Sequence, residues 1–265
     1  MVPLPGRLVI WPCERARPAR QPTCGTPQRA EHPGFSYCAE VLAPTSRHRA
    51  LLPAVAFGVG VSAPVFVLAY LVRAEAPGLA RFDEETIAAA TSFTRAHPAF
   101  LRALVVWQQL LQPVWVNLAG ALVCLWVWRR HGLGTRALWA LVTLMSAWLV
   151  QIGAKGLVQR ARPVVDDALE HAPGSSFPSG HATNTAAAAV TLTLLVWPLL
   201  GRRGRVVVPV AAATVTLLTA ADRVLLGVHH PSDVVAGMLL GTSMAGASYI
   251  GYQGWSLRPP TEGIS

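Results

Sequence analysis

The sequence predicts an all-α membrane protein built as a bundle of six transmembrane helices. Hydrophobic residues make up 52% of the 265 residues and charged residues only 13%, and the mean hydropathy is +0.42. So few charged side chains do not cover the surface of a single soluble globule of this length. Six segments without Asp, Glu, Lys or Arg are each close to the roughly 20 residues that a helix needs to cross hydrocarbon. They are residues 51–72, 103–128, 137–154, 182–201, 206–221 and 234–257.

Residues 1–50 have a different composition, with eight prolines and seven arginines. They contain no apolar run long enough for the core of a signal peptide, and we expect a disordered Pro/Arg-rich tail. A reading frame assigned too far upstream is an alternative that the sequence leaves open. Cys13, Cys24 and Cys38 lack paired CxxC spacing, and Cys124 lies within a predicted span, so all four are expected to be free thiols.

The connections between the spans predict the orientation. Residues 129–136 and 202–205 each contain three arginines and no acidic residue, which places both connections in the cytoplasm by the positive-inside rule. With six spans, both termini are then cytoplasmic as well. The predicted organisation is a tail at 1–50, a six-span domain at 51–257 and a short cytoplasmic tail at 258–265 in a multi-pass protein of the cell membrane.

The opposite connections carry both signs of charge and are expected at the outer face. Residues 73–95 contain acids and arginines, and we expect a short surface helix there. The fifth uncharged segment, 206–221, is short, although apolar residues resume at 224–228 beyond Asp222 and Arg223. This charged pair is therefore expected at the membrane surface or in a polar cavity.

Three polar clusters lie where these outer connections meet the spans, at 155–163, 178–181 and 222–233. The orientation that the basic loops predict brings all three clusters to one side of the membrane. From these clusters, Lys155, Arg162 and Arg223 bring three cations to one surface, and Lys155 is the only lysine in the chain. Ser179 and Gly180 add a hydroxyl and backbone N–H groups at an expected helix N-terminus, which is a favourable anion site. A phosphate is the predicted ligand.

Two histidines in these clusters can share the roles of nucleophile and general acid. His181 and His229 are suited to this because imidazole changes protonation near neutral pH. Asp233 follows His229 by four residues and lies in the expected first turn of the sixth helix, after Pro231. A carboxylate that holds one ring nitrogen leaves the other free to attack.

These clusters resemble the three-part signature of the type 2 phosphatidic acid phosphatase (PAP2) superfamily. Lys, six residues and Arg-Pro occur at 155–163, and Pro-Ser-Gly-His occurs at 178–181. The third part, Arg, five residues, His, three residues and Asp, ends at Asp233, but Asp222 replaces the family's leading Ser. The resemblance covers roughly residues 50–255 and implies a PAP2-type helical core of the membrane-embedded lipid phosphate phosphatase branch.

The resemblance also implies a role for each matching residue. His229 is expected to form a phosphohistidine, with Asp233 as its partner and His181 as the acid that protonates the leaving group and then activates water. The residues expected to hold the phosphoryl oxygens are Lys155, Arg162, Ser179, Gly180 and Arg223. Asp222 is expected to brace the guanidinium of Arg223. The family implies no metal and no cofactor.

Other polar residues near the motifs are expected to have no chemical role. We expect Arg160 to be solvated or to face lipid headgroups, and His230 to be an interfacial residue. The potential metal ligands Asp166, Asp167, Glu170 and His171 are expected in a solvated outer loop. In the sixth span, Gly237 and Gly241 form a GxxxG pattern that favours close packing within the bundle over dimerisation, and the oligomeric state stays open.

The predicted function is an integral membrane phosphatase that acts on a lipid phosphate or a lipid (isoprenoid) diphosphate at the outer face. Isoprenoid diphosphate, phosphatidic acid and phosphatidylglycerol phosphate all fit. One alternative is a vanadate-dependent haloperoxidase, which shares similar motifs but is soluble. A non-enzymatic lipid carrier is another, although it has no need of His229 with Asp233. Nucleic acid is not an expected partner, because the arginines form short clusters rather than a stripe.

Overall fold

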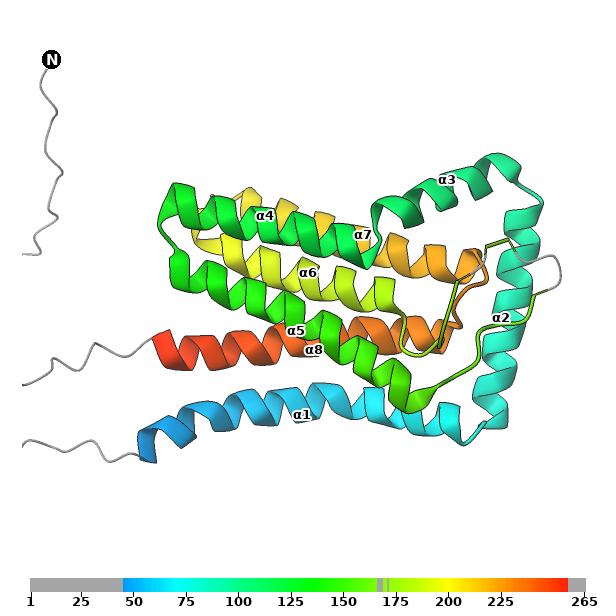
Figure 1. The fold of residues 1–265 in the computed structure, drawn as a ribbon, viewed down its shortest axis with the longest axis horizontal. Coiled ribbons are helices and arrows are strands. Elements are labelled where there is room, and N and C mark those ends of the chain that lie inside the picture. The colour runs from blue at the N-terminus through cyan, green and yellow to red at the C-terminus, as the bar shows by residue number, and fades with distance from the viewer. Residues whose placement is uncertain (1–44, 166–168, 171, 257–265) are drawn as a thin grey trace, which may run out of the picture. The chain divides into compact units, whose positions relative to one another are not determined.

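The computed structural model describes residues 45–165, 169–170 and 172–256, a part of the chain that contains helices and connecting segments but no strand. In chain order the elements are α1 (Thr45–Arg73), α2 (Pro77–Arg95), α3 (Pro98–Leu110), α4 (Pro113–His131), α5 (Gly134–Val158), α6 (Gly180–Val196), the 3₁₀ turn η1 (Trp197–Leu199), α7 (Gly204–Leu225) and α8 (Pro231–Ser256) (Figure 1). The expected all-α fold is confirmed. Residues 1–44 and 257–265 lie outside the described residues, and α1 begins inside the tail that the sequence predicts for residues 1–50.

Five of the described helices are long and apolar enough to cross a membrane, and a sixth span is formed if α3 and α4 count as one broken helix. These two helices share the predicted span 103–128 and are bent by 51° at their junction. Pro113 opens α4, and Gln112 before it has an extended backbone with ψ 142°. A proline disfavours helix in the preceding residue and has no N–H to continue the hydrogen-bond ladder. The second span is therefore broken, where the sequence analysis expected a continuous helix.

The surface helix expected within residues 73–95 is α2, which crosses the end of the bundle (Figure 1). Its buried residues are Asp83, Ile87, Thr91 and Thr94. Their spacing of three and four residues gives one inward face along the helix. The connection is thus a structural layer over the end of the bundle, longer than the short helix that was expected.

At the centre of the bundle lies α6, which is the most deeply buried spanning helix and contacts α4, α5, α7 and α8. Small residues allow α8 to approach it closely. A Cβ atom added at Gly237 would lie 2.7 Å from the carbonyl oxygen of Ser179, and one added at Gly241 would clash with the carbonyl oxygen of Thr183. The GxxxG pattern is therefore used for packing within the bundle, as expected.

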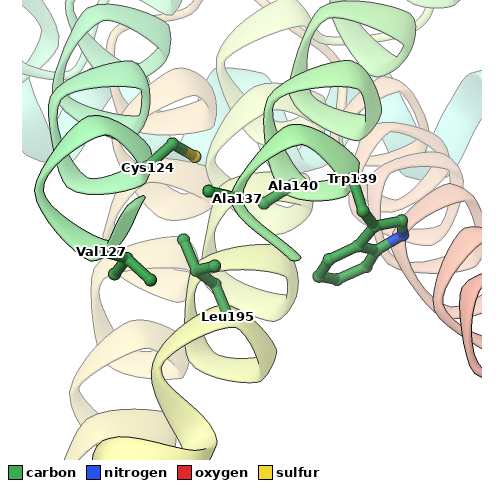
Figure 2. Packing of buried hydrophobic residues seen from close by; sticks show 6 residues of the cluster. All are labelled: Cys124, Val127, Ala137, Trp139, Ala140 and Leu195. Carbon is green, nitrogen blue, oxygen red and sulfur yellow. The ribbon is translucent and has the colours of Figure 1, made fainter. Parts of the chain in front are cut away.

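The two ends of the bundle differ in their connections. At one end, the α4–α5 and α6–α7 connections lie near the start of α1 and the end of α8 (Figure 1). A cluster of buried residues from α4, α5 and α6 packs near this end; it comprises Cys124, Val127, Ala137, Trp139, Ala140 and Leu195 (Figure 2). The α5–α6 and α7–α8 connections lie at the other end, under α2. The two basic loops and the three sequence motifs are consequently separated by the length of the bundle.

Candidate active site

The eight predicted site residues lie at the end of the bundle that α2 covers. They come from the last turn of α5, the segment after it, the start of α6, the end of α7, the α7–α8 connection and the start of α8; they are Lys155, Arg162, Ser179, Gly180, His181, Arg223, His229 and Asp233. The second and third motifs are joined directly, because the backbone N–H of Ser179 donates to the carbonyl of Asp233 at 3.0 Å. His181 is within electrostatic range of Lys155, Arg223 and His229. The three motifs thus form one site.

The N-terminus of α6 provides neutral hydrogen-bond donors to this site. Ser179 is fully buried at the N-cap position, and its hydroxyl oxygen and Nε2 of His181 are both buried without a partner among the described residues. A Cβ atom added at Gly180 would lie 3.0 Å from Oε1 of Gln151, so glycine allows α6 to begin close to α5. Free backbone N–H groups and an unused hydroxyl at a helix N-terminus favour an anion.

Three cations surround the same region, each anchored by neighbouring groups. Nζ of Lys155 donates to the carbonyl of Ser175 at 2.5 Å. Nη1 of Arg162 donates to the carbonyl of Val228 at 2.7 Å and lies 3.3 Å from Nε2 of His229. Burial lowers the pKa of the Arg162 guanidinium, an effect that Asp233 opposes and Arg223 reinforces. The resulting concentration of positive charge suits a phosphoryl group.

The third cation, Arg223, is buried and held by two side chains. Its Nε donates to Oδ2 of Asp222 at 2.9 Å, and its Nη2 contacts the same oxygen and donates to Oε1 of Gln108 at 2.8 Å. The expected bracing by Asp222 is confirmed. Gln108 of α3 is a second brace that the motifs did not reveal, because it reaches the site from the broken span.

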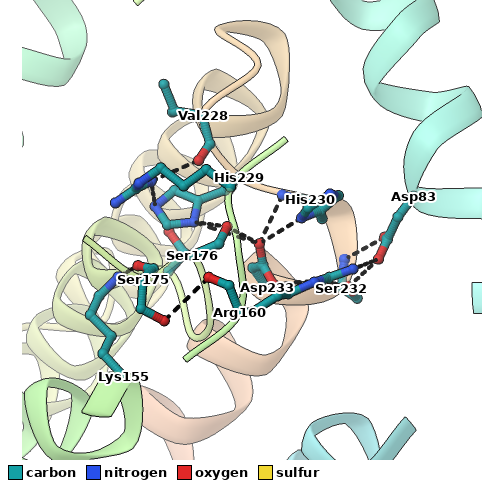
Figure 3. A network of polar contacts seen from close by, with 12 residues as sticks. Asp83, Lys155, Arg160, Ser175, Ser176, Val228, His229, His230, Ser232 and Asp233 are labelled. Atoms are coloured by element: carbon teal, nitrogen blue, oxygen red, sulfur yellow. Dashed lines mark hydrogen bonds and ion pairs between the residues drawn. The ribbon is translucent and has the colours of Figure 1, made fainter. Parts of the chain in front are cut away.

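His229 is oriented through a serine that the sequence analysis missed. Its Nδ1 lies 3.7 Å from Oδ2 of Asp233, too far for a direct hydrogen bond. Ser176 bridges the gap: its hydroxyl lies 3.3 Å from Nδ1 and donates to Oδ2 of Asp233 at 2.5 Å (Figure 3). Arg162 has only donors, so Nε2 of His229 must accept, and the ring proton lies on Nδ1. The nitrogen that faces the cations therefore carries the lone pair of the ring, which accepts the Arg162 N–H.

Asp233 is fully buried and has partners on both oxygens. Oδ2 accepts the backbone N–H of His230 at 2.9 Å, and Oδ1 accepts Nη1 of Arg160 at 2.7 Å. The side chain of Arg160 is only 15% exposed and also pairs with Asp83 at 2.8 Å. The expectation that Arg160 is solvated or faces headgroups was wrong, because two buried carboxylates draw it inward. His230, expected to be an interfacial residue, also turns inward, because its Nδ1 lies 3.3 Å from Oδ2 of Asp233.

Burial lowers the pKa of His229 to about 4, even though the Asp233 carboxylate acts in the opposite direction. The imidazole is therefore neutral at pH 7 and takes up a proton only as the pH falls through about 4. We predict this midpoint for the [¹⁵N]histidine resonance that is lost in the His229→Gln variant in detergent. A midpoint near 6.5, the value of a free histidine, would contradict the prediction and would mean that the Asp233 carboxylate fully offsets the effect of burial.

No three described His, Cys, Asp or Glu residues are grouped in a way that would hold a metal ion. Of the potential ligands in the α5–α6 connection, Asp166, Asp167 and His171 lie outside the described residues. Glu170 is described and is within electrostatic range of Arg223.

Comparisons with known proteins identify relatives of the region that carries the site. Residues 136–256 match the sequence model of the PAP2 superfamily. Decaprenylphosphoryl-5-phosphoribose phosphatase from two strains of Mycobacterium tuberculosis is 37% identical over 101 residues, which cover 37% of this chain and 51% of the relative. The chain therefore spans about half the length of these curated relatives.

The fold has a counterpart of known structure, the transmembrane PAP2 type phosphatidylglycerolphosphate phosphatase from Bacillus subtilis. The two superpose with a TM-score of 0.65 and 22% sequence identity, over 74% of this chain and 97% of that one. Both the sequence match and the fold agree with the family that the motifs indicate. Residues 136–256, which carry all three motifs, are thus the part of the chain that is similar to the PAP2 superfamily.

Proposed function

We propose that this protein is a membrane phosphatase that hydrolyses a lipid phosphate or a lipid (isoprenoid) diphosphate through a phosphohistidine on His229. One observation carries the proposal: Nε2 of His229 carries the lone pair of the ring and faces the guanidinium of Arg162 at 3.3 Å, while Nδ1 is held through Ser176. A neutral imidazole in this setting is a nucleophile directed at the place where a phosphoryl group would bind.

The residues divide the reaction into two steps. Lys155, Arg162 and Arg223, with the hydroxyl of Ser179 and the N–H groups at Gly180, hold the phosphoryl oxygens. Nε2 of His229 forms the N–P bond as the P–O bond to the leaving group breaks, and His181 protonates the departing oxygen. His181 then accepts a proton from the water that attacks phosphorus and breaks the N–P bond. Asp233 stabilises the imidazolium through Ser176, and no metal or cofactor takes part.

A lipid substrate is supported by the surroundings of the site. A cavity of about 980 Å³ lies between the end of α1, α2 and residues 158–165. It does not include His229, but Arg162 lines it, together with apolar side chains such as Leu71 and Ile87. Such a cavity suits the part of an amphiphile next to its phosphate. The M. tuberculosis relative is also named for a decaprenyl-linked phosphate.

A phosphate-release assay on the purified protein in detergent tests the proposal. The panel comprises phosphatidic acid, phosphatidylglycerol phosphate, an isoprenoid diphosphate and a soluble sugar phosphate. We expect release from at least one lipid, unchanged by EDTA and blocked by vanadate, because three fixed cations supply the charge that a metal would bring. Activity that EDTA abolishes and Mg²⁺ restores would refute the metal-free mechanism. Halide oxidation with added vanadate, or lipid transport without phosphate release, would refute the phosphatase.

We further propose that the site faces the outside of the cell and that both termini are cytoplasmic. Val164 is 98% exposed beside Arg162, and Gly201 is exposed in the basic α6–α7 connection. In intact cells, a membrane-impermeant maleimide is expected to label a Val164→Cys variant. A matched Gly201→Cys variant should react only after permeabilisation, because the positive-inside rule retains its loop in the cytoplasm. The reverse pattern would invert the topology.

A further inference from the structure

Asp83 of α2 contacts the site from outside the three motifs and from outside residues 136–256. It is fully buried. Its Oδ1 accepts the backbone N–H of Ser232 at 3.1 Å, and its Oδ2 accepts the hydroxyl of Ser232 at 2.5 Å and Nη2 of Arg160 at 2.8 Å (Figure 3). A carboxylate with this many donors has one defined orientation.

Arg160 extends this network to the centre of the site. Nη2 of its planar guanidinium fork donates to Asp83, and Nη1 donates to Oδ1 of Asp233 at 2.7 Å. Burial opposes the charge on Arg160, but the two carboxylates raise its pKa above the usual value, so it stays protonated. Because the fork is rigid, fixing one end at Asp83 fixes the direction in which the other end meets Asp233.

Asp83 also holds the turn from which Asp233 projects. Ser232 is the second residue of α8, and its N–H is one of the first four that have no partner within the helix. Asp83 satisfies it from another helix, in the way that an N-cap side chain does. One residue of α2 therefore contacts the start of α8 directly and the Asp233 carboxylate through Arg160.

We propose that Asp83, acting through Arg160, is a positioning residue that holds Asp233 against Ser176 and thereby sets the ring orientation of His229. The proposal rests on the proposed role of His229 as nucleophile. With Oδ1 of Asp233 taken by Arg160, Oδ2 is left for Ser176 and for the backbone N–H and the ring of His230. Without Arg160 in place, the carboxylate can rotate, and the ring of His229 loses its fixed partner.

The first test compares Asp83→Asn with Glu85→Gln, a matched change at an exposed acid on the same helix. Asn keeps the size of Asp but cannot accept from Ser232 and Arg160 with both of its terminal atoms. We expect kcat to fall roughly 10- to 100-fold, as for other supporting residues, with KM changed by less than about threefold. Glu85→Gln should leave both unchanged. A purely structural role would lower the yield and Tm but leave kcat per folded molecule intact.

A double-variant cycle tests whether Asp83 acts through Arg160. If it does, adding Asp83→Asn to Arg160→Gln should slow the enzyme little further, because the connection is already lost. If the fold loss in kcat of the double variant equals the product of the losses of the two single variants, the inference is overturned. If Asp83→Asn fails to fold, Arg160→Lys replaces it: the single ammonium cannot hold both carboxylates in the fork geometry, and the same fall in kcat without a change in KM is expected.

Vanadate binding separates a failure of this inference from a failure of the proposed function. Vanadate should raise the Tm of the wild type, and Asp83→Asn should weaken its affinity by roughly the same 10- to 100-fold factor. If the wild type releases no phosphate, the proposed reaction fails, but this binding comparison still decides the role of Asp83. Unchanged kcat and unchanged vanadate affinity in folded Asp83→Asn would overturn the inference. A wild type that does not bind vanadate would overturn both.

Discussion

Replacing His229 with Ala is expected to abolish turnover, with a loss in kcat of at least roughly 10⁴-fold, the scale seen when a catalytic nucleophile is removed. Of the two histidines in the motifs, His229 is the one whose Nδ1 is held through Ser176 to a buried carboxylate. Its other nitrogen thereby carries the lone pair that forms the covalent bond. His131→Ala, a change at an exposed histidine on the opposite end of the bundle, is the control and should leave kcat unchanged.

Rapid quench with ³²P-labelled substrate measures the intermediate directly. The wild type should carry a label that acid removes and base does not, as for a phosphoramidate, and His229→Ala should carry none. His181→Ala should have a different effect from His229→Ala, because it removes the general acid but leaves the nucleophile. With a substrate that has a very good leaving group, this variant should still accumulate label on His229. Label on His230, or on an acidic side chain, would contradict the assignment.

The sequence predicted the spans and the eight motif residues for physical reasons that operate over short distances. A membrane-crossing helix needs a continuous apolar run, and a motif at a helix end carries its geometry in its spacing. The broken second span had a signal as well, since Pro113 interrupts it. The uncharged residues on both sides of Pro113 nevertheless favoured the prediction of one continuous helix.

The supporting contacts of the site were harder to predict, because they join distant parts of the chain. Ser176 and Arg160 each lie two residues from a motif residue, but nothing in their spacing shows which way their side chains point. Asp83 had no local signal: it meets Ser232 across 149 positions of sequence. It is recognised only once α2 is known to cross the end of the bundle, where a buried carboxylate requires a charged partner.

Replacing Gly241 with Ala is the second change for which we expect a large effect. The added Cβ atom would clash with the carbonyl oxygen of Thr183 and lie 2.8 Å from the backbone nitrogen of Ala187, and neither backbone atom can move aside without moving α6. Within a bilayer, helices associate mainly through such close packing, so separating α6 from α8 has no compensating hydrophobic gain. We expect a destabilisation of about 1–3 kcal/mol, as for other overpacked sites.

Gly251→Ala on the same helix is the matched control. Its Cβ atom would meet Ala54 at 3.8 Å, an ordinary van der Waals contact, and Ala is the better helix former by about 1 kcal/mol. The Tm in detergent should therefore fall for Gly241→Ala and stay level or rise for Gly251→Ala. Equal Tm values would show that α6 and α8 have room to separate. Because Ser179–His181 lie at the start of α6 and Asp233 lies in the first turn of α8, such freedom would also contradict a site held rigid by the contact between these two helices.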